Sequence, residues 1–170
     1  TKPFIREFFV EAALAYDTAV IPGDVIEMVE DGRQFIVMNK TANNFEGTAY
    51  SYSAVLYKCN VAGVVLRPSN AKVNYKAKKY WYMRISPCYA LLTENQYGNE
   101  LNEDGDVGHS SLKVIDCYVS HWAGIEIGDQ FQVSANEYYR VESIALRKFD
   151  NVDLITLGED TRGLGQWVVF

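Results

Sequence analysis

The sequence predicts a mainly β protein, an antiparallel small barrel or sandwich with a short N-terminal helix. Tyrosine, phenylalanine and tryptophan occur 12, 8 and 3 times among 170 residues, and aromatic side chains suit a pleated, half-buried surface. Several short segments alternate apolar and polar residues between Gly, Asp and Asn, which is typical of antiparallel strands. A sheet with one apolar face must curl into a barrel or pack on a second sheet, and the length fits a single domain over residues 1–170.

The clearest alternation lies in residues 125–160. Gly128-Asp129 opens it, Phe131 and Val133 alternate with polar neighbours, and a polar turn follows at Ala135–Glu137. A second alternating run contains Tyr139 and Val141, and a third apolar run ends at Gly158. This stretch predicts a meander of three short strands.

Residues 1–22 predict an N-terminal helical segment, with the helix itself over Pro3–Tyr16. Proline suits a first helical position because its missing N–H costs no hydrogen bond there. An apolar stripe follows with helical spacing: Ile5, Phe8, Phe9, Ala12 and Tyr16. Such a helix would either cap one end of a barrel or dock on a neighbouring subunit.

A second Gly-Asp pair, Gly23-Asp24, begins a unit that resembles the one at Gly128-Asp129. An apolar strand, a polar turn and an aromatic-x-Val strand follow each pair, namely Phe35-Ile36-Val37 and Tyr139-Arg140-Val141. The two units are either a weak internal repeat of two small barrels or two hairpins of one barrel that flank a large insertion.

The middle and end of the chain predict further strands and one loop. Pro87 is expected to interrupt a long strand, and residues 95–109, polar and acidic with three glycines, predict a flexible loop or arm. The apolar end, residues 163–170, predicts a C-terminal strand that either completes the domain's own sheet or adds to a neighbour's. The other expected strands are Thr48–Cys59, Val64–Arg67, Lys72–Ser86, Tyr89–Leu92 and Ser111–Ser120.

No group of residues predicts catalysis, a metal site or a cofactor. His109, Cys117 and His121 are the only clustered soft ligands, and their spacing lacks the second pair that a tetrahedral site needs. On a strand, Cys117 and His121 would lie about 13 Å apart, too far for a nucleophile and its base. The three cysteines are expected to be reduced, buried and unlinked by disulfides in a reducing compartment. The chain is therefore predicted not to be an enzyme.

Two other patterns are weak. Gly163-Leu164-Gly165 precedes a predicted strand rather than a helix, which argues against a phosphate loop. The acidic residues Glu103, Asp104 and Asp106 lack the later glutamate of a calcium loop and predict a solvated surface. No apolar run approaches the roughly 20 residues of a membrane span, and the N-terminus does not have the pattern of a signal peptide.

Charge is strongly segregated along the chain. Residues 47–93 contain seven basic and no acidic residues, whereas the rest holds 9 basic and 22 acidic ones. The basic, aromatic segment Lys58–Arg84 has three interpretations: a nucleic-acid groove, the solvent face of a hairpin, or a surface that docks on the acidic part of a neighbouring copy. The candidate partner-binding residues are Arg67, Lys72, Lys76, Lys78, Lys79, Tyr80, Trp81, Tyr82, Arg84, Trp167 and Phe170.

Three patches of the chain resemble a known family. The patterns Ile127-Gly128-Asp129-x-Phe131-x-Val133, Tyr139-x-Val141 and Asp150-Asn151-x-x-Leu154-Ile155 are similar to the small, SH3-like β-barrel proteins at the head–tail neck of tailed bacteriophages. The opening Phe4-Ile5-Arg6 and the turn at Tyr57-Lys58-Cys59-Asn60 resemble them too. The resemblance covers about half of the chain.

The resemblance implies a virion structural protein, assembled in the host cytoplasm and without catalytic residues. It implies a homo-oligomeric ring between portal or adaptor proteins and the tail, through which DNA passes transiently; an adaptor, a stopper, a tail-completion protein or a minor capsid protein would share the pattern. Net acidity suits such a channel because like charge disfavours retention of DNA. The expected lumen-facing or mobile residues are Glu100, Glu103, Asp104 and Asp106. The alternative is a nucleic-acid-binding β-barrel that uses Lys58–Arg84.

Overall fold

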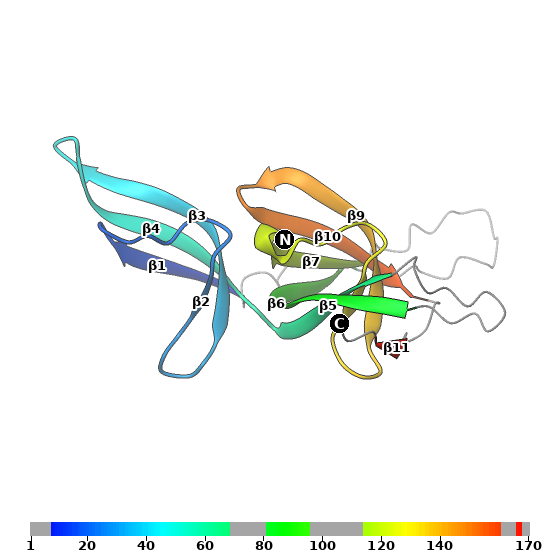
Figure 1. Cartoon of the computed structure of the whole chain (residues 1–170). Helices are drawn as coiled ribbons and strands as arrows, with labels where there is room; N and C mark the ends of the chain where they lie inside the picture. The colour runs from blue at the N-terminus through cyan, green and yellow to red at the C-terminus, as the bar shows by residue number, and fades with distance from the viewer. Residues whose placement is uncertain (1–7, 69–80, 96–113, 161–165, 168–170) are drawn as a thin grey trace, which may run out of the picture.

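The computed structural model describes residues 8–68, 81–95, 114–160 and 166–167, and most of them form antiparallel β-strands (Figure 1). The first four strands form an open sheet in the order β1-β4-β3-β2, which we call the wing. Six later strands form a closed antiparallel barrel in the order β6-β5-β8-β9-β10-β7, which β6–β7 pairing closes. The predicted mainly β, small-barrel fold class is confirmed.

The wing consists of β1 (Phe9–Ala15), β2 (Val25–Glu27), β3 (Gln34–Phe45) and β4 (Thr48–Lys58). The barrel consists of β5 (Val61–Pro68), β6 (Trp81–Asn95), β7 (Val114–Ser120), β8 (Gln130–Gln132), β9 (Tyr138–Phe149) and β10 (Val152–Glu159). A short 3-10 helix, η2 (His121–Ala123), follows β7. The strand β11 (Gln166–Trp167) pairs in parallel with β6, so this part of the C-terminal segment joins the chain's own sheet.

The predicted N-terminal helix is wrong over its described part, because Phe9–Ala15 forms strand β1. This strand pairs with β4 over its whole length, from Phe9 opposite Tyr57 to Ala15 opposite Ser51. Its inner side chains, Ala12 and Leu14, alternate with exposed ones and pack against the wing's core. The stretch that matches helical spacing thus also alternates between partly buried and exposed residues, as a strand requires. Pairing with β4 then overrides the helix propensity of alanine and glutamate. Residues 1–7 lie outside the described part.

Pro87 does not interrupt β6, contrary to the prediction. It lies opposite Val64 of β5. The strand β7 pairs with β6 only from Ala90 to Asn95, beyond Pro87. Proline is tolerated in a strand where its missing N–H is not needed by the ladder. The long strand is therefore continuous.

The two Gly-Asp pairs form the same turn in two different sheets. In each turn the Asp N–H donates to the carbonyl three residues earlier, at 3.2 Å for Asp24 and 3.1 Å for Asp129. In each, the Asp carboxylate also accepts from the N–H of that earlier residue, at 3.0 and 2.9 Å. The glycines have φ of 94° and 92°, as the third position of a type II turn requires. The sequence repeat is thus a repeated turn, one copy in the wing and one in the barrel. Both alternatives predicted for it, two small barrels and two hairpins of one barrel, are wrong.

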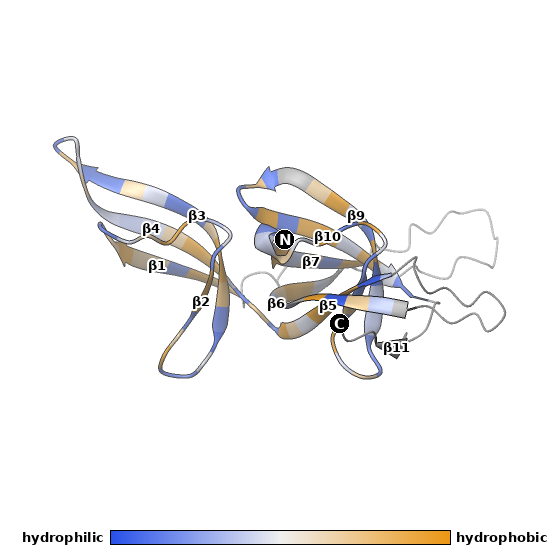
Figure 2. Cartoon of the chain, in the orientation of Figure 1, coloured by the Kyte–Doolittle hydropathy of each residue, from blue (hydrophilic) through white to orange (hydrophobic). Residues whose placement is uncertain are grey.

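The wing packs on the barrel through its lower end. Ile36 and Met38 of β3 pack against Val152 of β10 in one buried cluster, which Tyr57, Tyr118 and other partly buried side chains extend. The Tyr57 and Tyr118 rings meet edge to face with centroids 5.4 Å apart, and Tyr118 contacts Phe149 in turn. Figure 2 shows hydrophobic residues along the strands where the units meet and mainly hydrophilic ones along the distal part of β3. We call this contact the wing–barrel joint.

Gly23 brings the wing's turn directly against the barrel. A Cβ atom at this position would lie 2.4 Å from the carbonyl oxygen of Asn151, in the β9–β10 turn. The same carbonyl accepts a hydrogen bond from the His121 N–H at 2.9 Å, so it has little freedom to move away. Gly128, in the equivalent turn, has open space where its Cβ would be.

We predict that Gly23→Ala destabilises the protein more than Gly128→Ala. Both substitutions place alanine at a positive φ, which costs about 1–2 kcal/mol. Only Gly23→Ala adds a collision with a fixed backbone carbonyl, for which about 1–3 kcal/mol more is expected. Urea denaturation followed by tryptophan fluorescence measures both, and equal losses in the two variants would contradict the close contact.

Candidate functional site

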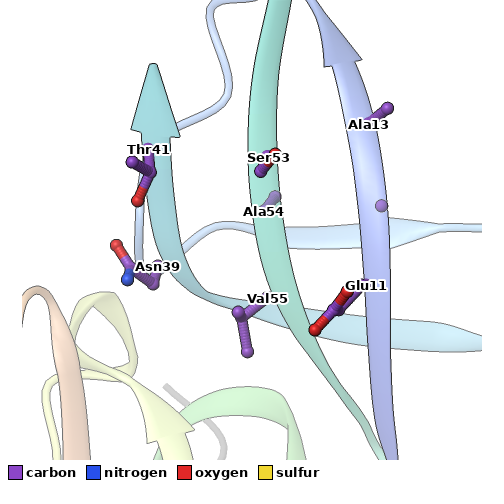
Figure 3. Close-up of a pocket in the computed structure, with 8 residues that line it drawn as sticks. Glu11, Ala13, Asn39, Thr41, Ser53, Ala54 and Val55 are labelled. Atoms are coloured by element: carbon purple, nitrogen blue, oxygen red, sulfur yellow. The ribbon is translucent and has the colours of Figure 1, made fainter. Parts of the chain in front are cut away.

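The wing carries a concave site on the face that, farther down, packs on the barrel. Two cross-strand rows build it: Glu11, Val55 and Asn39 lie side by side on β1, β4 and β3, and Ala13, Ser53 and Thr41 form the next row. Figure 3 shows Glu11, Val55, Asn39, Thr41 and Ser53 around this hollow. Its volume is about 370 Å³. We call it the wing groove.

The groove exists because its rows are made of short side chains. Ala13, Ser53 and Thr41 rise little above the sheet. At the base of the same face, the larger Tyr57 packs in the wing–barrel joint and Phe9 lies edge to face against it. Opposite this face, the wing buries a separate core of Phe35, Val37, Ala54 and Leu56. The sheet is therefore held from behind, and its upper inner face is left open.

The groove is polar and carries one charge. Asn39, Thr41 and Ser53 offer hydroxyl and amide groups, and Glu11 is the single charged residue among the eight that line the hollow. Within the described part of the chain, the Glu11 carboxylate has no ion-pair partner. Above the groove, the Asn43 amide donates to the Ser51 and Ser53 hydroxyls at 3.1 and 2.9 Å. Such a site suits a hydrogen-bonding ligand with a positive charge.

The tip of the wing exposes two large aromatic residues. Phe45 and Tyr50 flank the β3–β4 turn and are 69% and 61% exposed. The turn residues Glu46 and Gly47 both have positive φ, as the tight two-residue type I′ hairpin requires. Exposed aromatic groups at the end of a projecting hairpin are typical of a partner-binding element.

The predicted partner-binding residues that the structure describes differ in exposure. Tyr82 is 1% exposed and lies in the core, so its ring is not available to a partner. Arg67 donates to both carboxylate oxygens of Asp129, at 3.0 and 2.9 Å, and its exposed side also pairs with Glu126. The ion pair with the buried Asp129 carboxylate fixes the loop after η2 to strand β5. Of the basic residues in this group, Arg84 is exposed.

The remaining candidates are placed only partly. Trp81 lies in β6 and Trp167 in β11, and these two strands pair with each other, Trp81 opposite Gln166 and Trp167 opposite Tyr82. The predicted acidic loop begins at Asn95, the last residue of β6. Outside the described residues lie Lys72, Lys76, Lys78, Lys79, Tyr80, Phe170, Glu100, Glu103, Asp104 and Asp106.

The cysteines lie near the barrel and the joint as protonated thiols. Burial raises the pKa of Cys59 and of Cys88 to about 12, and burial raises the pKa of Cys117 well above its usual value. Cys117 is fully buried on β7, while His121 turns outward to the Asp153 carboxylate, whose oxygens lie 3.1 and 3.2 Å from its Nδ1. A protonated, buried thiol is a poor nucleophile. His109 lies outside the described residues, and those that are described contain no cluster of three metal-ligating side chains.

Sequence reasoning missed the wing groove. Its residues come from three strands, one of which, β1, was predicted as helix, so Glu11 and Ala13 were not placed beside Ser53 and Val55. The available signal was the small-residue alternation in Thr48–Val55 together with the polar run Asn39–Asn44. Within the described ranges, no helix has the length and apolar character that crossing a bilayer requires.

Comparison with known protein families, with curated proteins and with solved structures finds no match. What bears on function is therefore the geometry of the wing: an open sheet anchored at one end, with a polar groove on its inner face and aromatic residues at its tip.

We predict that the stability of the protein falls between about pH 9 and pH 12. In the unfolded chain a cysteine thiol has a pKa of about 8.5. In the folded protein the pKa of Cys59 and of Cys88 is about 12. Since a raised folded pKa gives stability that is complete below the unfolded pKa, this contribution is lost as the pH rises through that window. Thermal melts across it should decline more steeply for the wild type than for the triple variant Cys59→Ala, Cys88→Ala, Cys117→Ala; parallel curves would contradict the prediction.

Proposed function

We propose that this protein is a structural subunit of a virion that joins head to tail, working through contacts with its own copies and with neighbouring shell components. The observation that supports this most is the wing. It projects from a closed barrel, and Phe45 and Tyr50 at its tip are exposed. Exposed aromatic groups on a projecting hairpin suit an assembly subunit, which can bury them against a partner.

The sheet edges support the same proposal. Among the described strands, β1 pairs on one side only, with β4, so its other edge presents a row of backbone donors and acceptors. Natural proteins commonly protect such edges, and an unprotected edge is a template for pairing with another chain. The six described barrel strands close on one another through the β6–β7 pairing.

The ring around a DNA channel and its place at the neck rest on the sequence resemblance and on charge. The net charge of −6 disfavours retention of DNA in a channel. The alternative, nucleic-acid binding through Lys58–Arg84, has less support from the described residues. Tyr82 is buried and cannot stack on a base, and two acidic residues neutralise Arg67.

We predict that the purified protein self-associates with rising concentration into discrete particles, seen as rings in negative-stain micrographs. The double variant Phe45→Ser, Tyr50→Ser should keep the wild-type melting temperature within a few degrees, because both residues are exposed, and should weaken association about tenfold or more. Sedimentation velocity measures the association. Val29→Ser is the control: this residue is 98% exposed on the other hairpin of the wing.

A DNA-binding assay over a series of salt concentrations distinguishes the assembly proposal from the nucleic-acid-binding alternative. The assembly proposal predicts weak binding of single- and double-stranded DNA by filter assay, with a shallow dependence on salt. Tight binding whose logarithm falls with a slope of about −4 or steeper, from a protein that stays monomeric, would instead establish a nucleic-acid-binding barrel.

A further inference from the structure

We propose that the wing groove receives the basic connection between β5 and β6 of a second copy, with a lysine ammonium pairing with Glu11. This inference rests on the proposed function, since it requires self-association, and it names the surfaces that meet. Its structural basis is the groove itself, a polar hollow with a single carboxylate that has no ion-pair partner among the described residues.

Charge complementarity selects the occupant. Residues 8–46, which include β1 to β3 of the wing, hold seven acidic and two basic residues. Residues 69–80, which connect β5 to β6, hold four lysines and no acidic residue: Lys72, Lys76, Lys78 and Lys79. Opposite potentials of this kind steer two surfaces together and fix which surfaces meet.

Strand β5 leads away from the wing. It begins at Val61, directly after the wing–barrel joint, and ends at Pro68, seven residues later. At about 3.3 Å per residue, the two ends of β5 lie up to about 23 Å apart. Strand β6 starts beside the far end of β5, because Tyr82 pairs with Pro68. The lysine-rich connection is therefore attached to the barrel at the end of β5 that lies away from the joint.

The ends of β5 and β6 to which the connection is attached therefore lie on the side of the barrel away from the wing. In Figure 1 the wing lies on one side of the barrel, and the end of β5 and the start of β6 point to the other side. A contact between opposite ends of identical subunits is head to tail, which generates a ring where the rotation closes and a filament where it does not. The groove thus gives the assembly its direction.

Charge reversal tests the pairing. Glu11→Lys should weaken self-association about tenfold or more in sedimentation velocity, and adding Lys76→Glu, Lys78→Glu and Lys79→Glu in the same chain should restore at least part of it. Glu30→Lys is the matched control, because it makes the same charge change on an exposed residue of the same wing, outside the groove. Thr41→Trp, which fills the hollow without a change of charge, should also weaken association.

Cross-linking tests the contact directly. A carbodiimide that joins carboxylates to amines, applied to an equal mixture of ¹⁴N- and ¹⁵N-labelled protein, should give mixed-label peptides that link Glu11 to Lys76, Lys78 or Lys79. A monomeric wild type at every concentration would overturn both this inference and the proposed function. Wild-type assembly that Glu11→Lys and Thr41→Trp leave unchanged, with no Glu11 cross-link between labels, would overturn only the assignment of the groove.

Discussion

The wing–barrel joint is the contact on which the rest of the structure depends. The wing is an open four-stranded sheet, and its upper inner face and tip are not covered by any described part of the chain. What holds it in one orientation is the packing of Ile36 and Met38 on Val152 and the edge-to-face row of Tyr57, Tyr118 and Phe149. Because tightly packed contacts of this kind do not deform gradually, the groove and the aromatic tip are presented in a fixed position relative to the barrel.

The repeated Gly-Asp turn shows how one local device serves two different sheets. In both copies glycine supplies the positive φ, and the aspartate carboxylate accepts from the backbone three residues earlier. Their surroundings differ: Asp24 lies at the surface of the wing, whereas the side chain of Asp129 is 2% exposed and also binds Arg67. The same turn thus starts a strand in the wing and, in the barrel, also anchors the loop that follows η2.

The sequence predicted those features whose causes are local. The strands that contain Phe131 and the pair Tyr139 and Val141 depend on neighbouring residues, and they are found where they were expected, in β8 and β9. The N-terminal strand was missed because the same residues satisfy helical spacing, and only β4, some 40 residues later, decides between the two. Tyr82 was assigned to the surface for a similar reason: alternation near Tyr80-Trp81-Tyr82 does not show which face is buried until the barrel closes. The wing groove, which three strands build together, could not be predicted while one of them was taken for a helix.

The fold places the acidic wing and the attachment points of the lysine-rich connection in different parts of the molecule, and this affects how copies can associate. A contact that brought acidic wing against acidic wing, or lysine-rich connection against lysine-rich connection, would be opposed by like charges. In the proposed assembly the acidic wing of each copy meets the lysine-rich connection of another copy, so opposite charges come together. Whether such a chain of contacts closes depends on the angle between successive subunits, and in this molecule that angle follows from how the wing is set on the barrel. The packing of Ile36, Met38 and Val152 at the joint would then help to determine the number of copies in a ring.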